Sequence, residues 1–406
     1  MDGLGPISSE TAKRPPLVKA AVVVCGAVLA AGLLVVGLHV FGRPLARLVN
    51  PSSTPLQVEM SPPDAATGVA PDTPVSLTTA NGRLSTVRVT DAAGRLLHGT
   101  SSPDGRSWSS IGSPLAPDTT YTLVATVVDP SGRTQHRETS FTTLHPLGTL
   151  TDDIEPSQGK VGVASPIVVK FNHPVGNKAA VQRALGVQAS IPVVGAWHWL
   201  SAKEVHYRPQ SYWPTGEQVT VLSNLGGVDA GNGIWGVASR SVSFTVGDSH
   251  ISTVDIANHT MTVMDSGKVV KTFKDSAGRD KYPTMGGVHL VLGKEPDVLM
   301  DSQSVGIPRN SPDGYYEHVF QDVNISDGGE FVHSAPWSVG AQGNSNVSHG
   351  CVNLAPSDAA WFYDFSQPGD VVTIVNSPRA PEPGDHGTAD WNTPWSQWVA
   401  GGAQPV

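Results

Sequence analysis

From about residue 57 to residue 377, the chain consists of short runs in which apolar and polar side chains alternate. In Tyr121–Asp129 (YTLVATVVD) and Val219–Leu225 (VTVLSNL), every second side chain would face the same side of a strand. Turn sequences such as Ser102–Gly105 (SPDG) separate the runs. This rhythm predicts a mostly β protein with short strands and many turns.

The first part of this region contains an internal repeat. GVAPDTPVSL and SFTTL in the first copy resemble GVASPIVVKF and SFTVG in the second, at Gly68–Leu77, Ser140–Leu144, Gly162–Phe171 and Ser243–Gly247. We predict two immunoglobulin-like β-sandwiches, residues 57–146 and 147–248. Neither shows a polar cluster suited to catalysis, so we interpret both as spacers. Their cores are expected to hold the tryptophans Trp108, Trp197 and Trp199.

The pattern changes in residues 249–377, which predict a third, β-rich domain. Thr260–Phe273 alternates, turns at Asp-Ser-Gly and alternates again, as in a hairpin. Further strands are expected at Gly286–Gly293, Glu330–Ala335 and Gly369–Asn376. Pro356–Phe365 (PSDAAWFYDF) indicates one short helix whose first turn Ser357 or Asp358 would cap.

Near the N-terminus, Ala20–Phe41 is apolar apart from one histidine. At about 1.5 Å per residue, roughly 20 such residues cross a bilayer core. Three basic residues precede the run and two follow it, which favours an N-terminus inside the cell. We therefore predict a cytoplasmic segment at 1–19 and a transmembrane signal anchor at 20–41. The remaining chain would lie on the extracytoplasmic, cell-wall side of the cell membrane.

A cleaved signal peptide and a lipid anchor at Cys25 are the alternatives for this segment. No Ala-x-Ala site ends the run, and three bulky valines precede Cys25. Residues 42–56 are interpreted as a linker. Residues 378–406 form a tail with three tryptophans, which we expect to pack back on the protein and bridge the third domain and the second sandwich.

Charge and cysteine content exclude some classes of function and one source of stability. The net charge is −9 and no Lys/Arg-rich stripe is present, so nucleic-acid binding is not expected. Of the two cysteines, Cys25 lies in the apolar run and Cys351 lies in the exported part. The exported part therefore has no intrachain disulfide and depends on its packed cores.

Cys351 stands in the sequence NVSHGCVNLAPS, just before the predicted helix. A thiol with a pKa of about 8.5 is only a few per cent ionised at pH 7, but an imidazole that takes its proton makes it a strong nucleophile. We prefer His333 as this base, because a histidine on a neighbouring strand can approach the thiol from the side. His349, two residues away, is given a supporting role. A carbonyl or hydroxyl beside His333, such as that of Ser334, would fix the tautomer.

Gly350 permits a tight bend, so that N–H groups near Cys351 could point at a developing oxyanion. Other interpretations stay open at this point. A lone cysteine is often a small buried apolar residue, and Cys351 with His333 and His349 forms only a weak zinc pattern. We predict neither a metal nor a cofactor. Surface or packing roles are expected for the other histidines considered, His173, His206, His289 and His386.

The stretch His333–Asn353 (HSAPWSVGAQGNSNVSHGCVN) resembles the signature of the L,D-transpeptidases with a YkuD-like catalytic domain. That signature is a histidine, then 14 residues, then Ser-His-Gly-Cys, a hydrophobic residue and asparagine, and all of its parts are present here. The order of anchor, tandem immunoglobulin-like domains, third domain and tryptophan-bearing tail is similar to the actinobacterial cell-wall members. Two positions, Val305 and Met285, depart from the family pattern without removing a catalytic group.

The resemblance implies roles for ten residues. Cys351 would be the nucleophile and His333 the base, oriented by the main chain of Ser334. Tyr315 would help to form the oxyanion site together with the backbone at Gly350 and Cys351. Substrate-cleft and nucleophile-loop positions are implied for Met300, Trp337, Ser348, His349 and Asn353.

It also implies a reaction on peptidoglycan stem peptides. The thiol would attack the third residue of a tetrapeptide stem, release D-alanine and pass the acyl group to a diamino acid in a 3→3 cross-link. Carbapenems would acylate the same thiol. The alternatives are hydrolysis by an L,D-carboxypeptidase, attachment of a protein amine, and a non-enzymatic wall-binding or adhesion module.

Overall fold

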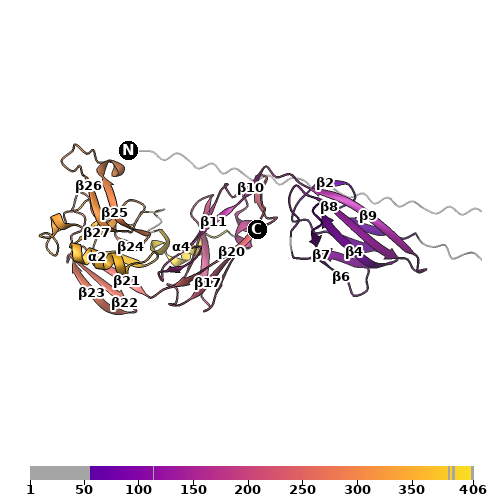
Figure 1. The fold of residues 1–406 in the computed structure, drawn as a ribbon, viewed down its shortest axis with the longest axis horizontal. Coiled ribbons are helices and arrows are strands. Elements are labelled where there is room, and N and C mark those ends of the chain that lie inside the picture. Colours follow the sequence, from indigo (N-terminus) through magenta and orange to yellow (C-terminus); the bar gives the residue numbers. More distant parts are fainter. Residues whose placement is uncertain (1–54, 113, 383–384, 386–388, 404–406) are drawn as a thin grey trace, which may run out of the picture. The chain divides into compact units, whose positions relative to one another are not determined.

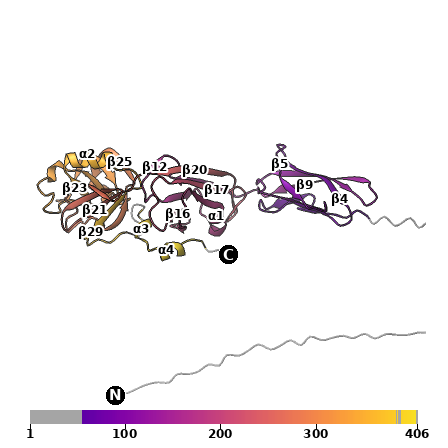
Figure 2. The same cartoon turned by 90° about the horizontal axis from the view of Figure 1, so that it is seen from below.

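The computed structural model describes residues 55–112, 114–382, 385 and 389–403. The predicted anchor at 20–41 lies outside these residues. Within the described ranges, no helix is long and apolar enough to cross a membrane. Three β-rich bodies follow one another along this part of the chain (Figures 1 and 2).

The first body is a sandwich of two sheets. Tyr121 and Phe141 stack between them with ring centroids 5.4 Å apart, and Trp108 is buried in the same core. One sheet has the order β1 (Val58–Ser61), β3 (Ser76–Thr79), β7 (Ser107–Ser110) and β6 (Gly99–Ser101). The other has the order β2 (Ala66–Val69), β9 (Thr134–Thr143), β8 (Thr120–Val128), β4 (Arg83–Asp91) and β5 (Leu96–Leu97).

The second body is also a sandwich, with a core in which Phe171 stacks on Trp199. One sheet has the order β11 (Asp152–Glu155), β13 (Ile167–Phe171), β16 (Glu204–Pro209) and β15 (Gly195–Trp199). The other has the order β12 (Lys160–Val161), β20 (Ser239–Val246), β17 (Gln218–Asn224) and β14 (Leu185–Ala189). A small sheet joins β10 (Gly148–Leu150), β19 (Ile234–Gly236) and β18 (Asp229–Gly231). The sequence analysis missed helix α1 (Lys178–Ala184), which Asn177 caps by accepting from the Ala180 N–H.

Core positions are thus confirmed for Trp108 and Trp199. Trp197 is only partly buried, packing edge-on against Tyr207 at the border of the core.

The third body combines two sheets with one helix of three turns. The first sheet has the order β23 (Lys268–Lys274), β22 (Thr260–Asp265), β21 (His250–Asp255), β29 (Val371–Val375) and β24 (Gly287–Leu290). The second has the order β25 (Gly293–Asp301), β26 (Tyr316–Asn324), β27 (Phe331–Ser334) and β28 (Val352–Leu354). Helix α2 (Pro356–Phe365) contacts β26 and β27, and short turns η1 (Ser302–Val305) and η2 (Pro336–Ser338) lie in the loops.

The predicted helix α2 is confirmed, but its predicted cap is wrong. Ala355 is the N-cap residue and makes no side-chain cap hydrogen bond, while Pro356 stands in the first turn. Because proline presets the helical backbone and has no N–H to satisfy, the helix can begin there without Ser357 or Asp358 as a cap. Asp358 lies in the first turn, where its charge favours the helix dipole.

The tail packs back on the protein, as predicted. Helices α3 (Ala389–Asn392) and α4 (Trp395–Ala400) lie in this segment (Figure 2). Helix α4 contacts β15 of the second body. The guanidinium of the buried Arg208 on β16 lies 4.7 to 5.1 Å from the ring centroids of Trp391, Trp395 and Trp398. Asn392 hydrogen-bonds Val288 of β24, so the tail joins the third body to the second sandwich.

Candidate active site

Two neighbouring parallel strands bring the candidate base and nucleophile to one place. In the register of β27 and β28, Val332 pairs with Val352 and His333 pairs with Asn353. Cys351 immediately precedes β28, and the loop between the strands folds through η2. As a result, Cys351 and His333 line the same cavity of about 250 Å³, which we call the His333 cavity.

The imidazole of His333 is held as a neutral base. Its Nδ1 lies 3.1 Å from the carbonyl oxygen of Ser334, which can only accept a hydrogen bond. Nδ1 therefore carries the proton and Nε2 presents its lone pair. The ring is almost fully buried, and burial lowers the pKa of His333 to about 4.

Cys351 is held as a neutral thiol. Its Sγ lies 3.9 Å from the carbonyl oxygen of Gly329. Burial of the sulfur raises the pKa of Cys351 to about 12, the Phe331 N–H opposes this rise, and the carboxyl groups of Glu330 and Asp322 add to it. The described residues contain no hydrogen bond between this thiol and His333. These two shifts favour a neutral thiol beside a neutral imidazole in the resting site.

The nucleophile loop is fixed by Ser348. Its Oγ accepts from the Gly350 N–H at 3.1 Å and donates to the Cys351 carbonyl oxygen at 2.6 Å. Gly350 has a φ of +135°, which favours glycine. The Gly350 N–H donates to Ser348 in the resting loop, and its contribution to an oxyanion site stays a prediction.

Asn353 and His349 support the loop from two directions. The Nδ2 of Asn353 donates to Ser338 Oγ at 3.0 Å, which joins β28 to η2. Nε2 of His349 lies 2.7 Å from a guanidinium nitrogen of Arg279, and because arginine only donates, the imidazole accepts. Burial and this guanidinium lower the pKa of His349. Its ring stays neutral and directed to Arg279, so it does not serve Cys351 as a base.

Three further predicted residues line the His333 cavity: Met300, Tyr315 and Trp337. Burial raises the pKa of Tyr315 to about 12, so its hydroxyl keeps its proton and can donate a hydrogen bond. The Trp337 ring is half exposed and its centroid lies 6.1 Å from that of His333. Eight of the ten predicted site residues thus line the His333 cavity. Of the other two, Gly350 lies in the nucleophile loop and Ser334 follows His333 on β27.

A second cavity, of about 360 Å³, reaches Cys351 without contacting His333. We call it the Glu330 cavity, because Glu330 lines it together with Lys281 and Arg379. The sequence analysis missed these residues as site residues. Glu330 was assigned to a strand, and Arg379 lies 49 positions away, so only the fold reveals their ion pair, Arg379 Nη1 to Glu330 Oε1 at 2.7 Å.

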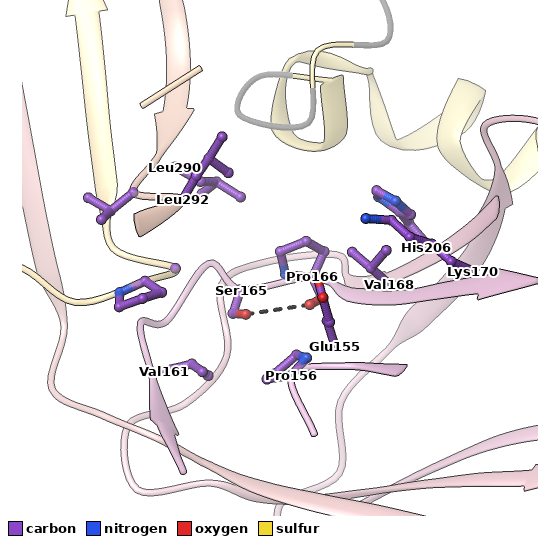
Figure 3. A pocket seen from close by; sticks show the side chains of 13 residues that line it. Glu155, Pro156, Val161, Ser165, Pro166, Val168, Lys170, His206, Leu290 and Leu292 are labelled. Atoms are coloured by element: carbon purple, nitrogen blue, oxygen red, sulfur yellow. Dashed lines mark hydrogen bonds between the residues drawn. The ribbon is translucent and has the colours of Figure 1, made fainter. Parts of the chain in front are cut away.

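A third cavity, of about 190 Å³, lies between the second sandwich and the third body (Figure 3). Leu290 and Leu292 line one side, and Pro166 and Val168 line the other. No thiol is among the residues that line this cavity, so it lacks the nucleophile that the two cavities at Cys351 share.

Comparison with known proteins decides the family. Residues 249–374 match the L,D-transpeptidase catalytic domain (YkuD), and residues 66–229 match a bacterial Ig domain. L,D-transpeptidase 2 of Mycobacterium tuberculosis (strain CDC 1551 / Oshkosh) is 41% identical over 364 residues, which cover 89% of this chain and 88% of that protein. The chain belongs to the L,D-transpeptidase family.

Two further relatives agree with this assignment. L,D-transpeptidase 5 of Mycobacterium tuberculosis (strain ATCC 25618 / H37Rv) is 34% identical over 354 residues, covering 85% of this chain and 76% of the relative. The solved structure of the LD transpeptidase LdtMt1 in complex with imipenem is 37% identical, with a TM-score of 0.50, and covers 57% of this chain and all 100% of that one. This L,D-transpeptidase is accordingly an enzyme with immunoglobulin-like and YkuD domains.

Proposed function

We propose that this L,D-transpeptidase forms 3→3 peptidoglycan cross-links with Cys351 as its nucleophile. The observation that carries the proposal is the shared cavity of Cys351 and His333, in which the Nδ1 bond to Ser334 leaves Nε2 free to take the thiol proton. The substrate would be a tetrapeptide stem whose third residue presents its carbonyl to the sulfur.

Acylation would proceed from the neutral pair. As Sγ bonds to the carbonyl carbon, His333 Nε2 takes the thiol proton, and the Tyr315 hydroxyl stabilises the oxyanion. His333 then gives the proton to the departing D-alanine amine, and the thioester remains on Cys351. This order suits the elevated pKa of the thiol, because the charged pair would form only together with the bond to carbon.

The second half-reaction would transfer the acyl group to the side-chain amine of a diamino acid on a neighbouring stem. Water in place of this amine would give an L,D-carboxypeptidase, and a protein amine would give an attachment enzyme. The Glu330 cavity, which a buried carboxylate lines, favours an amine. Family membership speaks against the non-enzymatic wall-binding alternative.

We further propose inhibition by carbapenems, supported by the relative whose structure is described in complex with imipenem. Anchoring by residues 20–41, with the folded domains on the cell-wall side of the membrane, remains a proposal from the sequence. Protease accessibility of the folded domains in intact cells and in spheroplasts would test the orientation.

The central experiment measures the intact mass of a fragment spanning residues 55–406. A carbapenem adduct on the wild type, its absence in Cys351→Ala, and a cross-linked dimer from tetrapeptide stems are expected. A wild type that stays unmodified by the carbapenem and releases no D-alanine from the stems would overturn the assignment of Cys351.

A further inference from the structure

Glu330 is a buried carboxylate with one unused oxygen. It is 5% exposed, and its Oε1 accepts from Arg379 Nη1 at 2.7 Å and from the Met285 N–H at 3.0 Å. Its Oε2 accepts no hydrogen bond from the described residues. Because an unpartnered buried carboxylate oxygen is costly, this position is suited to a donor that arrives with a ligand.

The Glu330 carboxylate lies against the loop that carries the nucleophile. A Cβ placed on Gly350 would be 3.4 Å from Glu330 Oε1, and Sγ of Cys351 lies 3.9 Å from the carbonyl oxygen of the preceding residue, Gly329. Both Glu330 and Cys351 line the Glu330 cavity, whereas His333 lines only the other cavity. A ligand group in the Glu330 cavity can therefore approach the sulfur from outside the His333 cavity.

The charges of the Glu330 cavity match an amino-acid end group. Among the described lining residues, Glu330 is the sole carboxylate, and Lys281 and Arg379 are the cations. An ammonium next to a carboxylate on one carbon, as at the reactive end of a diamino acid, could place the ammonium at Glu330 and the carboxylate towards the cations. Both cations already pair with carboxylates of the protein, Lys281 with Asp313 and Arg379 with Glu330 and Glu382. Water or a neutral group could hydrogen-bond to these residues but would bring no opposite charge.

We propose that Glu330 is a catalytic residue of the acceptor half-reaction, which binds the incoming ammonium of the acceptor diamino acid and takes its first proton. This inference rests on the proposed function and adds to it a residue and a cavity for the acceptor. Burial raises the pKa of Glu330, with the Met285 N–H and Arg379 opposing, so the carboxylate is a better base than an exposed glutamate.

The proton balance follows from these positions. The ammonium gives one proton to Glu330 and becomes a free amine, whose nitrogen attacks the thioester carbonyl. The new C–N bond forms and the C–S bond breaks, while the second proton of the nitrogen passes to the sulfur through His333 and restores the thiol. Glu330 then releases its proton to water.

The test compares wild type with Glu330→Gln in the 55–406 fragment. Acylation by a carbapenem and D-alanine release from a tetrapeptide stem report the donor half-reaction, and they should change much less than amide formation does. Amide formation with a diamino-acid stem should fall by about 10²-fold, so that the thioester is hydrolysed instead. Raising the pH should partly restore amide formation in Glu330→Gln, because the acceptor then arrives without the proton.

Two variants complete the experiment. Glu382→Gln removes another carboxylate from the same arginine, which it meets at 2.6 Å outside the cavity, and should keep the wild-type ratio of amide to acid. Glu330→Asp keeps a carboxylate and should keep the wild-type pH profile at a reduced rate, even if Glu330→Gln folds poorly.

An unchanged ratio of amide to acid in Glu330→Gln would overturn the inference. Equal loss of acylation and amide formation would also overturn it, because that result indicates a purely structural role in the nucleophile loop. Both outcomes differ from failure of the proposed function, in which the wild type itself would not be acylated.

Discussion

His333 and Asn353 are paired positions on the adjacent parallel strands β27 and β28. Cys351 immediately precedes β28. The register between the two strands therefore sets the position of the base relative to the nucleophile. Asn353 is in turn held by Ser338 at 3.0 Å and by backbone bonds with Ser276 at 3.0 and 3.1 Å. Because these contacts already hold the reacting groups in place, less entropy has to be lost when the transition state forms.

The first prediction concerns the resting thiol. Because burial raises the pKa of Cys351 to about 12, alkylation by iodoacetamide should keep accelerating above pH 9 and show no plateau near neutrality. His333→Ala should leave this pH curve nearly unchanged, since the imidazole does not ionise the resting thiol. The same variant should slow carbapenem acylation by about 10²- to 10⁴-fold. A plateau of alkylation below pH 7 in wild type would instead indicate a preformed ion pair.

The second prediction concerns the hydroxyl of Ser348. Ser348→Ala leaves the Gly350 N–H and the Cys351 carbonyl without their partner, so the free energy of unfolding should fall by about 1–3 kcal/mol. Carbapenem acylation should slow at the same time, because the loop that carries the sulfur loosens. Ser345→Ala is the matched control: that side chain is exposed and should change neither quantity.

The third prediction concerns Asp275, a fully buried carboxyl whose two oxygens have no partner among the described residues. Burial raises its pKa to about 7 from an unfolded value near 3.8, so the folded state binds the proton more tightly. Stability should therefore fall as the pH rises from about 4 to about 7, by about 1.4 kcal/mol for each unit of pKa difference.

Asp275→Asn cannot ionise and should lack this fall. The readout is the melting temperature at pH 5 and at pH 8, compared between wild type and Asp275→Asn. The difference in favour of the variant should be larger at pH 8. Parallel pH curves for the two proteins would show that Asp275 does not titrate in this range.

The fourth prediction concerns docking of the tail. His206 on β16 lies 3.0 Å from Asp390 of α3 and 2.8 Å from Glu204, and Arg208 is close by. Burial of His206 lowers its pKa, but the attraction of the two carboxylates outweighs this effect and raises the pKa of His206 to about 9. The resulting stabilisation is fully present below about pH 6.5 and is lost as the pH rises through 9.

Limited proteolysis of the tail between pH 6.5 and 10 checks this expectation. Cleavage between the tail and the third body should accelerate towards pH 10 in wild type. Asp390→Asn should be cleaved readily at every pH, because the imidazolium has lost its main partner. Cleavage of wild type that does not depend on pH would contradict the role assigned to His206.

Sequence patterns identified the elements whose signal is local or carried by a long motif. The spacing from His333 to Cys351 predicted a shared site, and the composition of Pro356–Phe365 predicted α2. The cap of α2 was wrong because Pro356 makes a side-chain cap unnecessary at this helix start. Helix α1 was missed because seven residues between strands give too short a periodic pattern.

Other parts of the site depend on tertiary contacts and could not be found from spacing. Glu330 directly precedes β27, and Arg379 follows β29. The two side chains meet only after folding. The neutral state of Cys351 and His333 follows from burial, which depends on how both sheets close around them. The engagement of the Gly350 N–H by Ser348 depends on one side-chain rotamer.

Arg208 among three tryptophans has a practical consequence for trimmed versions of this enzyme. A chain truncated near residue 377 would lack the three indole rings that cover the Arg208 guanidinium. The apolar surface around Arg208 on β16 would then be exposed to solvent. We expect such a truncated protein to aggregate and to lose its folded state during purification, even though Cys351 is still present. Helices α3 and α4 therefore complete the packing of the second sandwich and also tie it to the third body.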